Sequence, residues 1–153
     1  MKQRIYIDTS VFGGYFDNEF AEYTQPLFER VKKGELKIIY SDLTEQELEP
    51  SPEKVRRLVR SLPVASVDFI NVTAEAITLA TQYIVENVVG KTSYEDCLHI
   101  ALATIHKADY LVSWNFKHIV NVAKIRGYNA VNLKMGYAIL EIRSPRDLIK
   151  YED

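Results

Sequence analysis

Three carboxylates in this sequence lie where side chains could carry out chemistry. Asp8 directly follows the apolar run IYI and precedes two hydroxyl side chains, Thr9 and Ser10. Glu47 belongs to the acid-rich stretch SDLTEQELEP, and Asp96 belongs to TSYEDCLHIALA. A carboxylate that ends a strand serves either as a helix-capping residue or as part of a charged site, including a metal ligand. Both roles are open for Asp8, because one residue can cap a helix and also bind a metal.

Local capping patterns account for part of this acidity. Asp42 and Glu45 have the spacing of a capping box, and Ser93 with Asp96 repeats that arrangement at another predicted helix start. Glu47 lies two residues after Glu45, about 200° further around a helix, where no capping role covers it. An exposed helical glutamate is the alternative for Glu47, and a helix-terminal acid is the alternative for Asp96.

The three histidines and the single cysteine do not indicate a zinc site or a cysteine nucleophile. His99, His106 and His118 have no partner cysteine pair and no HExxH pattern, so a zinc site is not expected. His99 lies one turn after Asp96, and we expect its ring to pack against the sheet. We expect Cys97 to be a small buried residue. The sequence also lacks a nucleotide-binding loop and a Gly-x-Ser-x-Gly motif.

Length and composition limit the class of protein. The 153 residues suit a single domain over residues 1–153, and a lone cysteine fits a reducing cytoplasm. No apolar run approaches the roughly 20 residues of a membrane span, so no membrane partner is expected. The net charge of -2 means that an enzyme acting on nucleic acid would need local basic patches or metal ions to hold the phosphates. Ten tyrosines favour self-association, as a homodimer or higher homo-oligomer.

The periodicity of apolar residues predicts an α/β fold. Extended patterns occupy residues 4–7, 36–40, 109–114, 130–133 and 138–142, and residues 63–72 are extended but ambiguous. Helical patterns occupy residues 19–33, with a kink or break at Pro26, then 41–49, 52–62, 73–89, 93–108 and 116–127, before a final turn in SPRDLI. Strands that alternate with helices predict parallel strands, and ligands of such sheets collect beyond the carboxyl ends of the strands. Polar residues follow three of these ends: Asp8 and Ser10, Ser41 and Asp42, and Ser113 and Asn115.

The order of the three acids resembles that of the PIN domain family, the metal-dependent ribonuclease fold that includes the toxins of VapBC toxin–antitoxin pairs. YIDTSVFGG is similar to the family's opening strand-Asp-x-Ser segment, and SDLTEQELE is similar to its glutamate-bearing helix. EDCLHIALATIHKADYLVSWNFKHI resembles its aspartate-bearing helix and the next strand, and IRSPRDLI resembles its usual ending. The resemblance spans the chain and implies a three-layer α/β/α sandwich with a central, mostly parallel sheet.

The resemblance also implies roles for individual residues. It implies that the residues which act in catalysis and bind Mg²⁺ or Mn²⁺ are Asp8, Glu47 and Asp96. Ser10 and Ser113 are expected to contact substrate beside them. Asn115 stands where many members have a fourth acid. Its amide oxygen can ligate a metal or bind a metal-bound water but brings no charge, which favours one-metal chemistry or a metal that is recruited together with the substrate phosphate.

The implied activity is hydrolysis of RNA phosphodiester bonds by the toxin of a VapBC-type pair, with an antitoxin protein as partner. RNA needs a basic approach, and Arg56 and Arg60 lie one turn apart on the helix predicted for residues 52–62. A solvated helix face is the alternative for these arginines. Because Asn115 replaces an acid, a catalytically weak or inactive PIN-like module that binds RNA or a partner is the alternative function.

Overall fold

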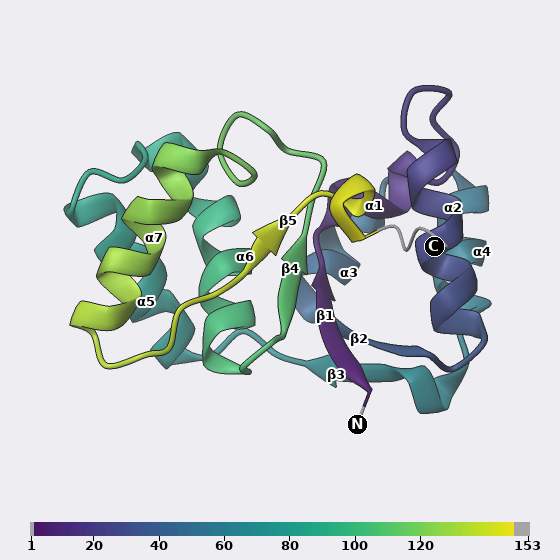
Figure 1. The fold of residues 1–153 in the computed structure, drawn as a ribbon, viewed down its shortest axis with the longest axis horizontal. Coiled ribbons are helices and arrows are strands. Elements are labelled where there is room, and N and C mark those ends of the chain that lie inside the picture. Colours follow the sequence, from purple (N-terminus) through teal and green to yellow (C-terminus); the bar gives the residue numbers. More distant parts are fainter. Residues whose placement is uncertain (1, 149–153) are drawn as a thin grey trace, which may run out of the picture.

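A five-stranded parallel sheet forms the centre of the computed structural model, which describes residues 2–148 (Figure 1). The strands, in chain order, are β1 (Gln3–Ile7), β2 (Leu36–Ser41), β3 (Val67–Ile70), β4 (Tyr110–Val112) and β5 (Ile142–Arg143). Their spatial order is β3-β2-β1-β4-β5, and every neighbouring pair is parallel. Ile5 is in register with both Ile38 and Tyr110, so the carboxyl ends of β1, β2 and β4 meet at one edge.

Helices cover both faces of this sheet. One face carries α1 (Thr9–Gly14), α2 (Ala21–Lys32), α3 (Asp42–Leu48) and α4 (Glu53–Arg60). The other face carries α5 (Ala74–Val85), α6 (Tyr94–Ile105) and α7 (Val122–Lys134), and the two groups lie on opposite sides of the strands in Figure 1. Short 3-10 turns are η1 (Val64–Ser66), η2 (Lys91–Ser93) and η3 (Pro145–Leu148). The expected three-layer α/β/α fold is confirmed.

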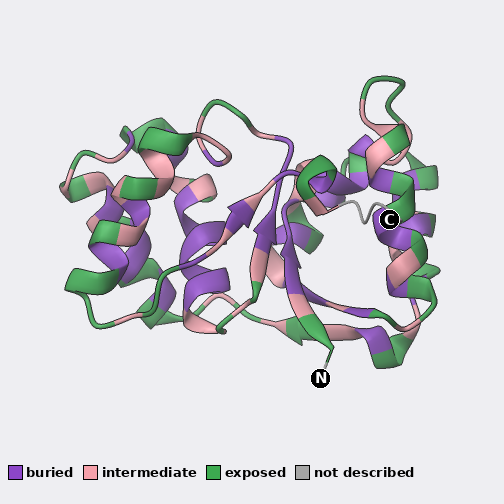
Figure 2. Ribbon diagram, viewed as in Figure 1, coloured by how far each residue is buried: buried purple, intermediate pink, exposed green. Residues whose placement is uncertain are grey.

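The strands are apolar on both faces, because both faces are covered. Tyr6 and Ile39 pack into the cluster under α5, α6 and α7, whereas Ile5, Ile7 and Ile38 pack into the cluster under α1 to α4. Figure 2 shows the central strands as mostly buried. Near-continuous apolar runs such as IYI are typical of parallel strands that alternate between two cores.

The last third of the chain differs from the expected elements. The helix expected over residues 116–127 begins only at Val122, where the side chain of Asn121 accepts a hydrogen bond from Lys124 N at 3.2 Å. That helix continues to Lys134, so the strand expected over residues 130–133 is wrong. Asn132 is fully buried and hydrogen-bonds Tyr83 of α5. Packing between α5 and α7 therefore outweighs the local preference of this segment.

Other expected elements differ from the structure in their bounds or in detail, and of the strand expected over residues 138–142 only Ile142 belongs to a strand, β5. The helix expected around Pro26 is continuous from Ala21 to Lys32, so the expected break is wrong, and Gly34 follows with the positive φ of +79° expected of a helix-ending glycine. The ambiguous residues 63–72 contain β3. The final turn extends from Pro145 to Leu148, and Ile149 lies outside the described residues. Among residues 2–148, no helix has the length and apolar character needed to cross a membrane.

Candidate functional site

Asp8 lies at the carboxyl end of β1, where its backbone N–H donates to the carbonyl of Val112 at 3.0 Å. Asp8 precedes α1 as its N-cap residue, but its carboxylate is held by side chains. The hydroxyls of Ser10 and Ser113 both donate to Oδ2, each at 2.8 Å. The other oxygen, Oδ1, lies 3.7 Å from His99 Nε2. Two hydroxyls, one from α1 and one from the residue after β4, thus orient a carboxylate that is only 5% exposed.

The helix that carries Glu47 begins differently from the expectation. Ser41 is the N-cap of α3, and its hydroxyl accepts a hydrogen bond from Thr44 N at 3.1 Å. Asp42 instead accepts a hydrogen bond from the backbone N–H of Val72 at 3.0 Å. The predicted capping box of Asp42 and Glu45 is therefore wrong, and Glu45 is exposed to solvent.

Glu47 extends from α3 toward the carboxyl end of β1. Its Oε1 accepts a hydrogen bond from the Thr9 hydroxyl at 2.9 Å and also contacts His99 Nε2. Burial alone would raise the pKa of Glu47, but the hydrogen bond and positive charge of His99 and the hydrogen bond of Thr9 outweigh it and hold the pKa low. Glu47 is therefore held as a carboxylate beside Asp8.

His99 of α6 links the acidic cluster to the sheet. Its ring is 1% exposed and lies edge-on to Tyr6 of β1, so the expected packing against the sheet is correct. Nδ1 lies 2.6 Å from the hydroxyl of Tyr6, which in turn hydrogen-bonds the Ser41 hydroxyl at 2.8 Å. Burial disfavours the charged ring, yet the hydrogen bond of Glu47 and the charges of Asp8, Glu47 and Asp96 raise the pKa of His99 overall.

The contact between His99 and the acids was missed in the sequence. The available signal was its spacing from Asp96, because residues three apart share one face of a helix.

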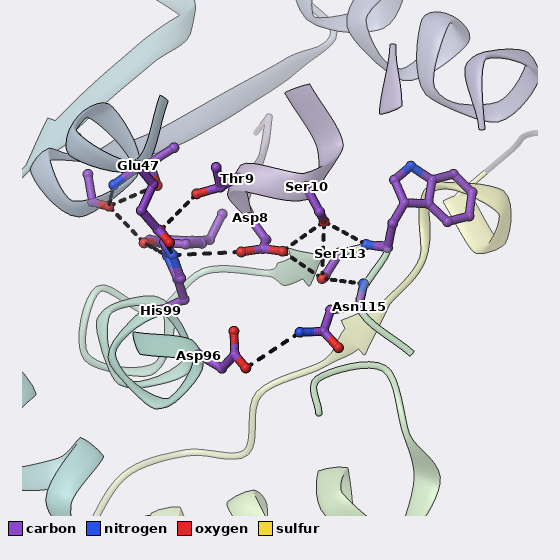
Figure 3. A network of polar contacts seen from close by, with 12 residues as sticks. Asp8, Thr9, Ser10, Glu47, Asp96, His99, Ser113 and Asn115 are labelled. Carbon is purple, nitrogen blue, oxygen red and sulfur yellow. Dashed lines mark hydrogen bonds and ion pairs between the residues drawn. The ribbon is translucent and has the colours of Figure 1, made fainter. Parts of the chain in front are cut away.

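Asp96 lies in the first turn of α6 and faces the same region (Figure 3). Ser93 precedes the helix as its N-cap residue, but within the described residues its side chain makes no capping bond, so the predicted pairing of Ser93 with Asp96 is wrong. Burial raises the pKa of Asp96, and the negative charge of Asp8 raises it further. Asp96 is thus a carboxylate that would gain from a nearby cation.

Asn115 follows β4 and faces Asp96. Its amide oxygen accepts hydrogen bonds from the backbone N–H groups of Lys117, at 3.2 Å, and His118, at 3.0 Å. Its amide nitrogen lies 3.5 Å from Asp96 Oδ2. Only the oxygen can accept from backbone N–H groups, so the orientation of this amide is determined by its partners. The oxygen expected to serve a metal is bonded to the backbone in this conformation.

Arg56 and Arg60 lie on α4 and bond to groups of their own region. Arg56 donates to the carboxylate of Glu53 at 2.7 Å and to the carbonyl of Ser51 at 2.6 Å, and Arg60 contacts the same carboxylate. Both arginines line a depression beside Tyr40, between α3 and α4. The structure thus groups Asp8, Glu47 and Asp96 at one edge, with the arginines engaged by Glu53.

The carboxylate oxygens at this edge are of the chemical type that hard divalent cations prefer. Figure 3 shows the side chains of Asp8, Glu47, Asp96 and His99 gathered around one region at the end of β1. As placed within residues 2–148, no three His, Cys, Asp or Glu side chains form a group that could already hold a metal ion. Carboxylate oxygens are the ligands that Mg²⁺ and Mn²⁺ prefer, and a cation would offset both the burial and the repulsion from Asp8 that raise the pKa of Asp96.

These features define an α/β protein whose acids gather at the carboxyl edge of a parallel sheet. The sequence matches the PIN domain family over residues 5–123, which is more than half of its length. The chain therefore belongs to the PIN domain family.

Solved structures share this fold. VapBC2 from Rickettsia felis, bound to a promoter DNA fragment, has a TM-score of 0.57 at 15% identity, with 93% of this chain and 98% of that chain covered. VapBC from Salmonella typhimurium, bound to DNA, has a TM-score of 0.57 at 15% identity, covering 95% and 99%. The sarcin-ricin loop cleaving toxin VapC20 from Mycobacterium tuberculosis has a TM-score of 0.56 at 13% identity, covering 74% and 91%. The comparison with curated proteins finds no match.

Proposed function

We propose that this protein is a metal-dependent endoribonuclease that hydrolyses phosphodiester bonds in RNA. The observation that carries the proposal is the meeting of three acids at one edge of the sheet: Asp8 directly after β1, Glu47 in α3 and Asp96 in α6. Membership in the PIN domain family supports it. The structural likeness to a toxin described as cleaving the sarcin-ricin loop is consistent with RNA as the substrate class.

In this proposal Asp8, Glu47 and Asp96 hold Mg²⁺ or Mn²⁺. When bound, such an ion neutralises charge on the scissile phosphate and lowers the pKa of a water molecule. The surrounding residues keep the ligands in place. Ser10 donates to Asp8 and accepts from Trp114 N at 3.0 Å, and Ser113 donates to Asp8 and accepts from Asn115 N at 2.9 Å.

A hydroxyl has one proton to donate, and both serines direct theirs to Asp8. We therefore assign Ser10 and Ser113 to the orientation of Asp8 rather than to contact with substrate. We assign Asn115 likewise to the orientation of a neighbouring acid, because its amide nitrogen faces Asp96 while its oxygen binds the backbone.

We further propose that the protein is the toxin of a VapBC-type pair, acts in the cytoplasm and binds an antitoxin protein. Structures with this fold include VapBC complexes from two bacteria and the FitAB complex, each bound to DNA. Light scattering of the purified protein, alone and with the product of the adjacent gene, tests this assembly and the proposed homo-oligomer. A mass equal to one chain in both samples would contradict both.

A cleavage assay tests the nuclease proposal directly. Purified protein is incubated with structured RNAs, including tRNA, in Mn²⁺, Mg²⁺ or a chelator, beside the Asp8→Asn variant. We expect cleavage with the metals, and none with the chelator or the variant. The amide oxygen introduced by Asp8→Asn could still accept hydrogen bonds from Ser10 and Ser113, so the fold of the variant should persist.

A second candidate function is a PIN-like module that binds RNA without cleaving it. The absence of a fourth acid at Asn115 favours this candidate, because one fewer negative charge holds a cation less strongly. RNA binding by wild-type protein, without metal-dependent cleavage, would support the module over the nuclease.

A further inference from the structure

We propose that His99 is a positioning residue that holds Glu47 in the orientation needed for metal binding, and that Tyr6 and Ser41 fix the ring of His99. This role deepens the proposed function, in which Glu47 is a metal ligand. The residues form one continuous polar path. It extends from Ser41 at the end of β2, through Tyr6 of β1 and His99 of α6, to Glu47 of α3.

The path is buried where apolar side chains would be expected. His99, Tyr6 and Ser41 are exposed by 1%, 0% and 0%, and Tyr6 lies in the apolar cluster with Ile39 and Leu111. Polar groups in such surroundings are costly unless each has a partner, whereas apolar groups of the same shape can be nearly neutral in stability. Packing alone therefore does not require a hydroxyl at Tyr6 or a ring nitrogen at His99.

The two ends of the imidazole have different surroundings. Nδ1 faces the Tyr6 hydroxyl at 2.6 Å, inside the core. Nε2 contacts Glu47 Oε1 and lies 3.7 Å from Asp8 Oδ1, so it ends among the carboxylates. A histidine that served only the core would direct both nitrogens to structural groups. Here the ring connects Tyr6 in the core to Glu47 and Asp8, which are two of the three proposed metal ligands.

Glu47 needs such a support more than the aspartates do. Its longer side chain has more rotatable bonds than an aspartate, and it remains 27% exposed. Thr9 and His99 both bind its Oε1, from α1 and α6, and thereby restrict the carboxylate. Restricting a ligand before binding lowers the entropic cost of forming the site, and groups behind metal ligands typically change affinity by about 10- to 100-fold.

The test compares Mn²⁺ affinity with stability in matched variants. Wild type, His99→Phe, His99→Gln and Tyr6→Phe are titrated with Mn²⁺ by calorimetry, and the free energy of unfolding is measured in chelator. Tyr83→Phe is the control, because Tyr83 is also 0% exposed and its hydroxyl bonds Asn132. Tyr83 contacts α7 rather than the acids, so its loss should lower stability only.

We expect His99→Phe to weaken Mn²⁺ binding by about 10- to 100-fold, the range typical of groups behind metal ligands. Tyr6→Phe should weaken binding by a smaller factor. His99→Gln should retain more affinity than His99→Phe, because its amide can still donate to Glu47. Tyr83→Phe should bind Mn²⁺ as tightly as wild type.

Four outcomes would overturn the proposal. If both His99→Phe and Tyr6→Phe bind Mn²⁺ as tightly as wild type, His99 has no positioning role, and the proposed nuclease function is unaffected. If His99→Phe does not fold, equal Mn²⁺ affinities of Tyr6→Phe and Tyr83→Phe would also contradict the positioning role. Nitrogen coupling from a directly bound imidazole in the electron spin echo spectrum of Mn²⁺ would make His99 a ligand instead. Wild-type protein that binds no Mn²⁺ would overturn the proposed function together with this role.

Discussion

The amide nitrogen of Asn115 faces Asp96 Oδ2 at 3.5 Å, because the amide oxygen is bonded to the backbone of Lys117 and His118. An aspartate at this position could keep those backbone bonds with one oxygen, but its other oxygen would face the carboxylate of Asp96. We expect Asn115→Asp to lower the free energy of unfolding of the metal-free protein by about 2 kcal/mol near neutral pH. Mn²⁺ should restore more stability to this variant than to wild type.

Chemical denaturation in chelator and in Mn²⁺ measures both effects. Asn121→Asp is the control, because Asn121 caps α7 through its side chain and aspartate is an equally good cap. Equal losses in the two variants would contradict a specific repulsion between position 115 and Asp96.

Ser113 connects β4 to both Asp8 and Asn115 although it is fully buried. Its hydroxyl donates to Asp8 Oδ2 at 2.8 Å and accepts from Asn115 N at 2.9 Å. Ser113→Ala leaves a buried N–H and a carboxylate without this partner, so we expect a loss of about 1–3 kcal/mol in the free energy of unfolding. Urea unfolding measures this loss. The exposed Ser61, whose hydroxyl donates to the carbonyl of Leu58, should lose less when changed to alanine, and the reverse order would refute this interpretation.

Two adjacent glycines in α1 should respond oppositely to alanine. A Cβ at Gly14 would lie 2.8 Å from Cδ1 and Nε1 of Trp114, a packed side chain that is 8% exposed. A Cβ at Gly13 would meet no atom of the described residues within 4 Å. We expect Gly14→Ala to cost about 1–3 kcal/mol and Gly13→Ala to gain up to about 1 kcal/mol. Thermal unfolding of both variants measures the difference, and a loss at Gly13 as large as that at Gly14 would contradict the steric explanation.

The pair of His99 and Glu47 should make stability depend on pH in the absence of metal. The pKa of His99 is raised above its ordinary 6.5, so its contribution to stability is fully present below pH 6.5 and is lost as the pH rises through the folded-state pKa. The pKa of Glu47 is lowered from 4.5, so its contribution is present above pH 4.5 and is lost in acid.

In chelator, the stability difference between wild type and His99→Gln should therefore be larger at about pH 6 than at about pH 9, because the unfolded-state histidine loses its proton above about pH 6.5 while the raised pKa favours the protonated ring in the folded protein. Urea unfolding at both pH values measures it. A difference that grew with rising pH would show that the ring is neutral in the folded protein.

Arg56 and Arg60 of α4 are candidates for RNA contact, but RNA would have to compete with the carboxylate of Glu53 for them. Arg56 and Arg60 share the carboxylate of Glu53. We expect Arg56→Ala with Arg60→Ala to weaken RNA binding and to reduce the slope of log affinity against log salt by about 1–2. Fluorescence anisotropy in the Asp8→Asn background measures both, with Lys32→Ala on α2 as the control. An unchanged slope would assign these arginines to the helix surface alone.

Much of the site was predictable because its residues follow strands. Asp8 and Ser113 come directly after apolar runs, and parallel strands bring such ends together. The preference for Glu47 over Glu45 agrees with the structure, in which Glu45 is exposed and Glu47 contacts Thr9 and His99. The capping box that first suggested this preference was wrong, because Ser41 caps the helix instead.

The sequence by itself determined the alternation of strands and helices, the parallel sheet and the family, and it singled out the three acids that we propose as metal ligands, because these inferences depend on periodicity and on order along the chain. The tertiary structure alone decided that residues 130–133 are helical, that His99 joins Glu47 to Tyr6, and that Asn115 presents nitrogen to Asp96. Each of these depends on contacts between residues far apart in the sequence or on which partner occupies a polar atom. Local propensity contains neither kind of information.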